Sequence, residues 1–203
     1  MPHRAAATVF MVIAAIAGAA GCAREPRPPA PYAGLMLAQA KAKPDFTLTD
    51  DRGRPFRFRA ATDGYLTLLY FGYTHCADVC PIQMANIAGA KHSLPPADQA
   101  RLRVVFVTTD PDRDTQDRLR AWLGNFDSSF IGLRGTTAEI HALETTFGLP
   151  QSQRGTGSME YEMGHAAMVL AFTPDDSLRL MYPSSTSREG WTSDLRRLLA
   201  SSP

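Results

Sequence analysis

The chain has 203 residues, of which 44% are apolar, with three cysteines and a formal net charge of +1. This length and composition suit one globular domain with an additional segment. The balanced charge offers no basic face of the kind that neutralises phosphates, so we expect no nucleic-acid partner.

The first 21 residues have the pattern of an export signal. A short basic stretch ends at Arg4, an apolar run covers residues 5–20, and small residues precede Cys22. The run is shorter than the roughly 20 residues that a membrane span requires. The residues before Cys22 resemble a bacterial lipoprotein signal, in which this cysteine is acylated, and acyl chains hold a protein at a membrane. Ordinary cleavage nearby and an uncleaved anchor are the alternatives.

The next segment, residues 22–43, is rich in proline, alanine and arginine and has no helical or strand periodicity. Such a composition is typical of a partly extended tether. We therefore expect the signal and tether to place the protein on the periplasmic side of a bacterial membrane. The folded domain is predicted to cover residues 44–203, with its first ordered residues near Phe46.

Within this domain, the sequence pattern alternates between strands and helices. Alternating residues predict an N-terminal β-hairpin, and nearly unbroken apolar runs predict strands buried on both faces of a sheet. The predicted strands cover residues 45–50, 56–58, 66–71, 104–107, 130–133, 167–172 and 178–182. Apolar residues at helical spacing predict four helices. Their predicted N-terminal caps are Asp78, Asp114, Thr136 and Thr186.

This order of elements predicts an α/β fold with a central mixed sheet flanked by helices. It fits a thioredoxin-like core with an N-terminal β-hairpin and an inserted helix. Residues 150–164 are polar and lack periodicity, so we expect a mobile loop there, next to His165.

Cys76 and Cys80 are the most informative residues of the domain, because they follow a predicted buried strand and open a predicted helix. Unpaired backbone N–H groups and the positive end of the helix favour thiolate there. A lowered thiol pKa serves both metal binding and disulfide exchange. Three residues separate the two cysteines, which leaves more freedom to spread the sulfurs around an ion than two would. In an oxidising compartment, the pair would also readily form a structural disulfide.

His165 is a candidate third ligand, because the loop before the strand 167–172 of a thioredoxin-like core faces the cysteine turn. Two thiolates and one imidazole suit copper, whose Cu(I) form accepts three soft ligands and whose Cu(II) form usually adds an oxygen. Zinc would normally require a fourth ligand in a structural site. A solitary histidine before a strand is otherwise more often a hydrogen-bonded loop residue.

Other polar residues near these positions have simpler interpretations. Asp78 and Asp110 can cap a helix or offset its dipole, although Asp110 follows a buried strand and can also orient a ligand or Arg113. His75 adjoins Cys76 and can tune it or point away. We expect His92 and His141 to be solvated, and the three methionines 159, 163 and 168 to fill the core or loops.

The motifs resemble those of the Sco/SenC family of copper proteins over roughly residues 46–199. They are FGYTHCADVCP at residues 71–81, DPDRDT at residues 110–115, and Tyr161 followed by His165. The resemblance implies a thioredoxin-like, membrane-tethered protein with copper held by Cys76, Cys80 and His165. It also implies a partner, the copper-receiving subunit of cytochrome c oxidase, whose dicopper centre such proteins help to assemble.

Two positions depart from the family pattern. Ala77 stands where proline is common, and Gly164 stands where an acidic residue usually precedes the histidine. Ala77 loosens the turn that carries the cysteines, and Gly164 removes an acceptor for the His165 ring, so both bear on metal affinity.

Three functions compete at the level of sequence. The first is a copper metallochaperone, and the second is an enzyme, a thiol-disulfide oxidoreductase that uses Cys76 and Cys80 to reduce cysteines of an oxidase subunit or another exported protein. The two functions are compatible, because disulfide formation destroys a thiolate metal site and reduction restores it. A peroxidase ranks last, since it needs one activated cysteine and gives His165 no role.

Overall fold

The computed structural model describes residues 31–156 and 161–201, which belong to one unit that begins at Pro31. The predicted signal segment 1–21, Cys22 and Met159 lie outside the described residues. No helix in the described part of the chain is long and apolar enough to cross a membrane.

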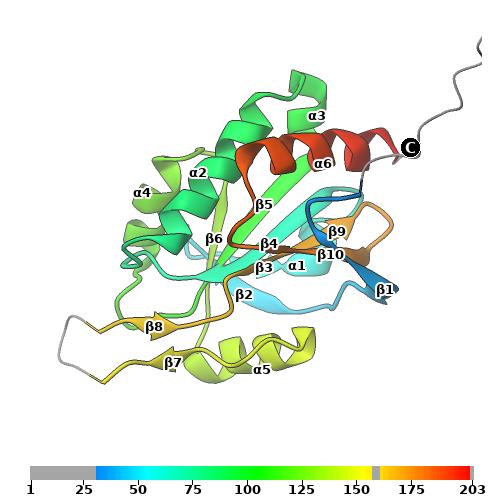
Figure 1. Ribbon diagram of the computed structural model, residues 1–203. Coiled ribbons are helices and arrows are strands. Elements are labelled where there is room, and N and C mark those ends of the chain that lie inside the picture. Colours follow the sequence, from blue (N-terminus) through cyan, green and yellow to red (C-terminus); the bar gives the residue numbers. More distant parts are fainter. Residues whose placement is uncertain (1–30, 157–160, 202–203) are drawn as a thin grey trace, which may run out of the picture. The chain divides into compact units, whose positions relative to one another are not determined.

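The core of the unit is an eight-stranded mixed sheet in the order β1-β10-β9-β4-β5-β6-β2-β3 (Figure 1). β4 pairs in parallel with β5, and β5 with β6, whereas all the other neighbouring strands of this sheet pair antiparallel. The strands are β1 (Leu35–Ala42), β2 (Thr47–Asp50), β3 (Pro55–Arg57), β4 (Leu66–Gly72), β5 (Leu102–Thr108), β6 (Ile131–Arg134), β9 (Met168–Thr173) and β10 (Ser177–Pro183). The predicted mixed sheet and the N-terminal hairpin, formed by β2 and β3, are confirmed.

Helices cover both faces of the sheet (Figure 1). They are α1 (Phe58–Ala61), α2 (Val79–His92), α3 (Pro96–Ala100), α4 (Gln116–Gly124), α5 (Thr137–Phe147) and α6 (Arg188–Ala200). One apolar cluster joins α2, α4 and α6 to the sheet, and a second joins α1 and α5 to its other face. Because successive strand residues point to opposite faces, Tyr70 of β4 enters the first cluster and Phe71 the second. β4 is buried along its whole length. It therefore holds the start of the loop that follows it in a fixed position.

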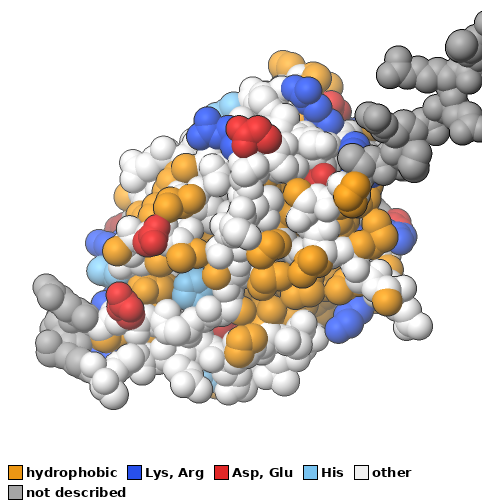
Figure 2. All heavy atoms as spheres, in the orientation of Figure 1, with side chains coloured by type: hydrophobic (Ala, Val, Ile, Leu, Met, Phe, Trp, Pro, Cys, Tyr) orange, Lys and Arg blue, Asp and Glu red, His pale blue; other side chains and the backbone are white. Residues whose placement is uncertain are grey.

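The predicted tether is too long at its C-terminal end, because β1 pairs with β10 and extends the sheet. Seven of its eight side chains are exposed, so the strand is held by backbone pairing and leaves no apolar alternation in the sequence. Beyond β1, Lys43 is buried and forms an ion pair of 2.6 Å with Asp176. Leu35 and Met36 are exposed, and Figure 2 shows hydrophobic side chains at the surface over this part of the sheet.

The helix starts follow the prediction to within one or two residues. The capping box of Thr136 and Glu139 is present at α5. At α4 and α6, however, the caps are Thr115 and Ser187, whose hydroxyls accept backbone hydrogen bonds. The predicted cap Asp114 is instead committed to buried tertiary contacts, and Thr186 donates its hydroxyl to the Pro183 carbonyl. Local sequence suggested both positions, but the Asp114 side chain is used by a tertiary hydrogen bond and the Thr186 side chain by a local bond in the turn before α6.

The segment 150–164, predicted as a loop, contains two short strands. β7 (Gln153–Arg154) and β8 (Met163–Gly164) pair antiparallel and form a small separate sheet. Their side chains are mostly exposed, so no apolar pattern marks them in the sequence. The β7–β8 hairpin leads directly to His165.

Candidate metal centre

The two cysteines lie where the central strand β4 passes into α2. Cys76 is in the connecting loop and Cys80 is in the first turn of the helix. The Cys80 N–H donates a hydrogen bond to Cys76 Sγ at 3.4 Å. Asp78 occupies the N-cap position, but its carboxylate makes no capping hydrogen bond. Cys76 sulfur therefore takes the role that a capping side chain usually has at a helix start.

The fold brings His165 to these sulfurs from the other end of the chain. His165 Nε2 lies 3.6 Å from Cys80 Sγ. The ligand atoms of Cys76, Cys80 and His165 all lie within 4.8 Å of one another. The His165 ring packs edge-on against Tyr73, with 5.5 Å between ring centroids. The structure thus assembles the three residues that the sequence singled out.

The spacing of these three atoms suits a metal ion. At metal–ligand distances of about 2.0–2.3 Å, nitrogen and sulfur ligands at a trigonal or tetrahedral ion lie about 3.6–4.0 Å apart. The distance between His165 Nε2 and Cys80 Sγ falls at the lower end of this range. His165 Nδ1 is buried and has no hydrogen-bond partner among the described residues, so Nε2 is the ring atom that faces the sulfurs. The donor set therefore suits a soft ion, and binding would draw the three ligand atoms, which lie within 4.8 Å of one another, into this range.

The two thiols have different environments, although both are free. Cys80 is fully buried and Cys76 is partly exposed. A hydrogen bond from the Cys80 thiol, helped by the backbone N–H groups of Cys80 and Asp78, holds the pKa of Cys76 well below its usual range. The same hydrogen bond, together with burial, raises the pKa of Cys80. The pair is thus arranged as an accessible thiolate beside a buried thiol. Asp78 contributes to it through its backbone N–H.

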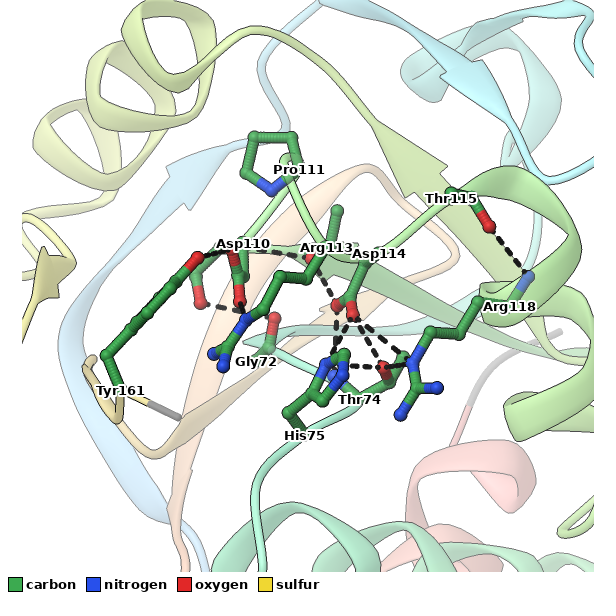
Figure 3. Close-up of polar contacts among 12 residues, drawn as sticks. Gly72, Thr74, His75, Asp110, Pro111, Arg113, Asp114, Thr115, Arg118 and Tyr161 are labelled. Atoms are coloured by element: carbon green, nitrogen blue, oxygen red, sulfur yellow. Dashed lines mark hydrogen bonds and ion pairs between the residues drawn. The ribbon is translucent and has the colours of Figure 1, made fainter. Parts of the chain in front are cut away.

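A buried carboxylate, Asp114, fixes the loop that carries Cys76 (Figure 3). Its oxygens accept hydrogen bonds from the Thr74 backbone N–H at 2.9 Å, from the Thr74 hydroxyl at 2.5 Å and from the Thr108 hydroxyl at 2.6 Å. His75 Nδ1 lies 3.4 Å from Asp114, so this imidazole contacts the carboxylate and is not in the three-residue cluster. Asp114 thereby ties the end of β5 to the cysteine loop.

Asp110 has a comparable role on the histidine side of the site (Figure 3). Its carboxylate accepts the Tyr161 hydroxyl at 2.7 Å and pairs with Arg113. The Tyr161 ring lies between two guanidinium groups, with Arg113 at 3.6 Å and Arg154 at 3.8 Å from its centroid. Because Tyr161 comes just before β8, these contacts hold the hairpin that carries His165. The predicted contact of Asp110 with Arg113 is present, and Tyr161 connects this pair to the segment before His165.

Sequence reasoning missed Asp114 and Thr74 as parts of the site. The available signal was a polar residue in each of the loops that follow two neighbouring buried strands, β4 and β5, because parallel pairing brings the ends of these strands to the same edge of the sheet. The remaining candidates lie elsewhere: His92 bonds Asp127, His141 bonds the Ser152 carbonyl, and Met163 and Met168 pack against the apolar clusters.

The mixed sheet, with a two-cysteine turn at the end of its central strand, defines a thioredoxin-like protein that carries a candidate metal site. Residues 36–200 match the model of the SCO1/SenC family, and the chain belongs to this family. The resemblance noted in the sequence is thereby confirmed.

Known proteins of similar sequence and structure include a mitochondrial relative and two bacterial ones. The SCO2 homolog of Bos taurus is 31% identical over 163 residues, which are 77% of this chain and 59% of the relative, so the chain spans about three fifths of that protein. The solution structure of apo Sco1 from Thermus thermophilus has a TM-score of 0.74 and 31% identity, covering 83% of this chain and 97% of that one. The structure of Bradyrhizobium japonicum ScoI with copper bound has a TM-score of 0.69 and 29% identity, covering 78% and 99%.

Proposed function

We propose that this protein is a copper metallochaperone that holds one copper ion between Cys76, Cys80 and His165. The observation that carries the proposal is the convergence of two sulfurs and one imidazole nitrogen within 4.8 Å. Soft sulfur ligands favour Cu(I) and zinc, and the imidazole is acceptable to both copper oxidation states. A structural zinc site would normally require a fourth ligand, so the three-ligand set favours copper. The copper-bound structure of the Bradyrhizobium japonicum relative supports this assignment.

The exposure of the site suits release of the ion as well as its capture. Cys80 is buried, whereas Cys76 is partly exposed and lies near the protein surface. A partner that approaches the protein could therefore replace the accessible Cys76 sulfur before the buried Cys80 sulfur.

We assign the receiving partner as the copper-binding subunit of cytochrome c oxidase, with the chain contributing to its dicopper centre. This assignment rests on family membership. The predicted export signal and the acylated Cys22 would place the domain on the periplasmic side of a membrane, beside such a subunit. Labelling cells with a fatty-acid analogue, with Cys22→Ser as the control, tests the anchor; absence of label from the unmodified protein would remove lipidation from the proposal.

A second candidate function is thiol-disulfide reduction, which the asymmetry of the two thiols favours. A partly exposed Cys76 with a lowered pKa can attack a substrate disulfide, and the buried Cys80 can then resolve the mixed disulfide. The overall exchange transfers two electrons and two protons from the dithiol to the substrate, leaving a Cys76–Cys80 disulfide. An external dithiol would have to regenerate it.

Titration of the reduced protein with Cu(I), in competition with a chromophoric chelator, tests the metal site. We expect one ion per chain, loss of tight binding in Cys76→Ser and Cys80→Ser, and weaker binding in His165→Ala. His92→Ala is the matched control, since this histidine is exposed and bonds Asp127. Unchanged affinity in His165→Ala would remove the imidazole from the site.

Incubation with a copper-free domain of the oxidase subunit distinguishes the two functions. The copper content and the number of free thiols are then measured in both proteins. Transfer of copper at unchanged thiol content supports the metallochaperone. Loss of the domain's disulfide without copper movement, matched by disulfide formation in this protein, supports the reductase and contradicts the primary proposal.

A further inference from the structure

A tyrosine hydroxyl contacts one sulfur of the candidate site. The Tyr70 hydroxyl donates a hydrogen bond to Cys80 Sγ at 3.5 Å. The rings of Tyr70 and Tyr73 both pack against His165, with centroid distances of 6.3 Å for Tyr70 and 5.5 Å for Tyr73. Tyr70 therefore contacts a sulfur as well as the imidazole of the candidate site.

The strand β4 holds Tyr70 in this position. Tyr70 is fully buried, and its ring meets Phe106 of the neighbouring strand edge-on at 5.7 Å. Two residues further, on the same face of β4, Gly72 leaves the space that the sulfur occupies. A Cβ atom at this glycine would lie 2.9 Å from Cys80 Sγ. The close approach of the sulfur to the strand thus brings it within reach of the Tyr70 hydroxyl.

A hydrogen bond to a sulfur withdraws electron density from it. In sulfur-ligated metal sites, such bonds are among the groups that set redox potential and ligand strength. They stabilise the electron-rich form of the sulfur, which is the thiolate rather than the disulfide. For a thiolate-bound metal they favour the lower oxidation state.

We propose that Tyr70 tunes this centre by donating a hydrogen bond to Cys80 Sγ, which favours the dithiol over the disulfide and the cuprous over the cupric ion. The cuprous part rests on the proposed copper-binding function, whereas the dithiol part concerns the metal-free chain alone. In the dithiol couple, reduction breaks the bond between the sulfurs and adds two electrons and two protons. An external dithiol supplies them and becomes a disulfide itself.

The test compares Tyr70→Phe with the unmodified protein, both without metal. The substitution removes one hydroxyl and keeps the ring. Tyr182→Phe is the matched control, because Tyr182 is also fully buried and stacks on Trp191 at 4.1 Å, but its hydroxyl has no hydrogen-bond partner among the described residues. The proteins are equilibrated with mixtures of a small dithiol and its disulfide, and the oxidised fraction is measured by thiol alkylation and mass spectrometry.

We expect Tyr70→Phe to shift the equilibrium threefold to tenfold toward the disulfide, which is about 14–30 mV for a two-electron couple. The control should match the unmodified protein. Equal potentials in Tyr70→Phe and the unmodified protein, or an equal shift in the control, would overturn the proposal. Should Tyr70→Phe fail to fold, a fluorinated tyrosine at position 70, whose hydroxyl is a stronger hydrogen-bond donor, tests the same claim with the opposite expected shift.

A second measurement uses the copper-loaded protein. The sulfur-to-Cu(II) absorption band should move to lower energy in Tyr70→Phe, because a sulfur without its hydrogen bond is easier to oxidise, and Tyr182→Phe should leave the band in place. If the unmodified protein binds no copper, the proposed function fails while the metal-free result still decides the role of Tyr70. If copper binds normally and neither readout changes, the proposal for Tyr70 fails alone.

Discussion

The cysteine side and the histidine side of the site are built differently. The cysteines stand between a fully buried strand and a helix, β4 and α2, and their loop is tied to β5 by Asp114. His165 instead follows the β7–β8 hairpin, whose strands have two residues each and expose most of their side chains. Its support is a small network around Tyr161.

Because of this difference, we expect substitutions on the two sides of the site to affect different properties. Contacts on the cysteine side are shared with the core, so we expect changes there to lower the free energy of unfolding. Contacts on the histidine side serve mainly to orient one ligand, so changes there should weaken metal binding while the domain stays folded. The comparison leads to four tests, ordered from the largest expected effect to the smallest.

Asp114→Ala should have the largest effect, because it leaves the Thr74 backbone N–H and two hydroxyls without their acceptor. We expect a loss of about 2–5 kcal/mol in the free energy of unfolding, since each unpaired buried donor costs about 1–3 kcal/mol. Urea unfolding measures it. Asp117→Ala is the control on the neighbouring helix, where the carboxylate is 87% exposed. Equal stability of the two variants would contradict a structural role for Asp114.

Gly72→Ala tests the close packing beneath Cys80. The added methyl group would lie 2.9 Å from both Cys80 Sγ and the Phe106 ring. Overpacking of this kind costs about 1–3 kcal/mol, and displacement of the sulfur should also weaken copper binding. Gly124→Ala is the matched control, since nothing lies within 4 Å of a Cβ atom there. Wild-type stability and copper affinity in Gly72→Ala would show that the sulfur does not depend on this space.

Tyr161→Phe should affect copper binding more than folding, as expected for the histidine side. The variant loses the hydrogen bond to Asp110 but keeps the ring between the two guanidinium groups. We expect unfolding to change by about 1 kcal/mol and copper affinity to fall about tenfold, the lower end of the range for groups that orient a ligand. Tyr65→Phe, at the opposite end of β4, is the control for loss of a hydroxyl. A larger change in stability than in binding would reverse the proposed division.

The difference between the two sulfurs should appear in their alkylation. Because the pKa of Cys76 is lowered by its hydrogen bond from Cys80, Cys76 should remain thiolate as the pH falls below the ordinary cysteine value of about 8.5. We therefore expect iodoacetamide to modify Cys76 between pH 5 and pH 7, at rates at least about tenfold above a free thiol peptide. The raised pKa and burial of Cys80 should leave it unmodified. Peptide mass spectrometry identifies the labelled residue, and preferential labelling of Cys80 would refute this assignment.

Regular local patterns predicted most of the fold. The buried strand β4, the capping box at Thr136 and the hairpin of β2 and β3 follow from short-range alternation and capping chemistry, and the structure contains all three. The exposed strands β1 and β8 were missed for the opposite reason. Backbone pairing holds these strands, β1 with the distant β10 and β8 with β7 of the same hairpin, and such pairing leaves no apolar period in their own sequence.

The amino-acid sequence by itself determined the chemical identity of the site, because two thiols at the junction of a buried strand and a helix, with one distant imidazole, define a soft donor set. Only the tertiary structure decided that His165 Nε2 faces Cys80 Sγ and that Asp114 holds a loop rather than capping a helix. Nor could the sequence show that Tyr70 reaches a sulfur. These contacts join residues between 10 and 85 positions apart, and their geometry depends on how the strands of the sheet are paired.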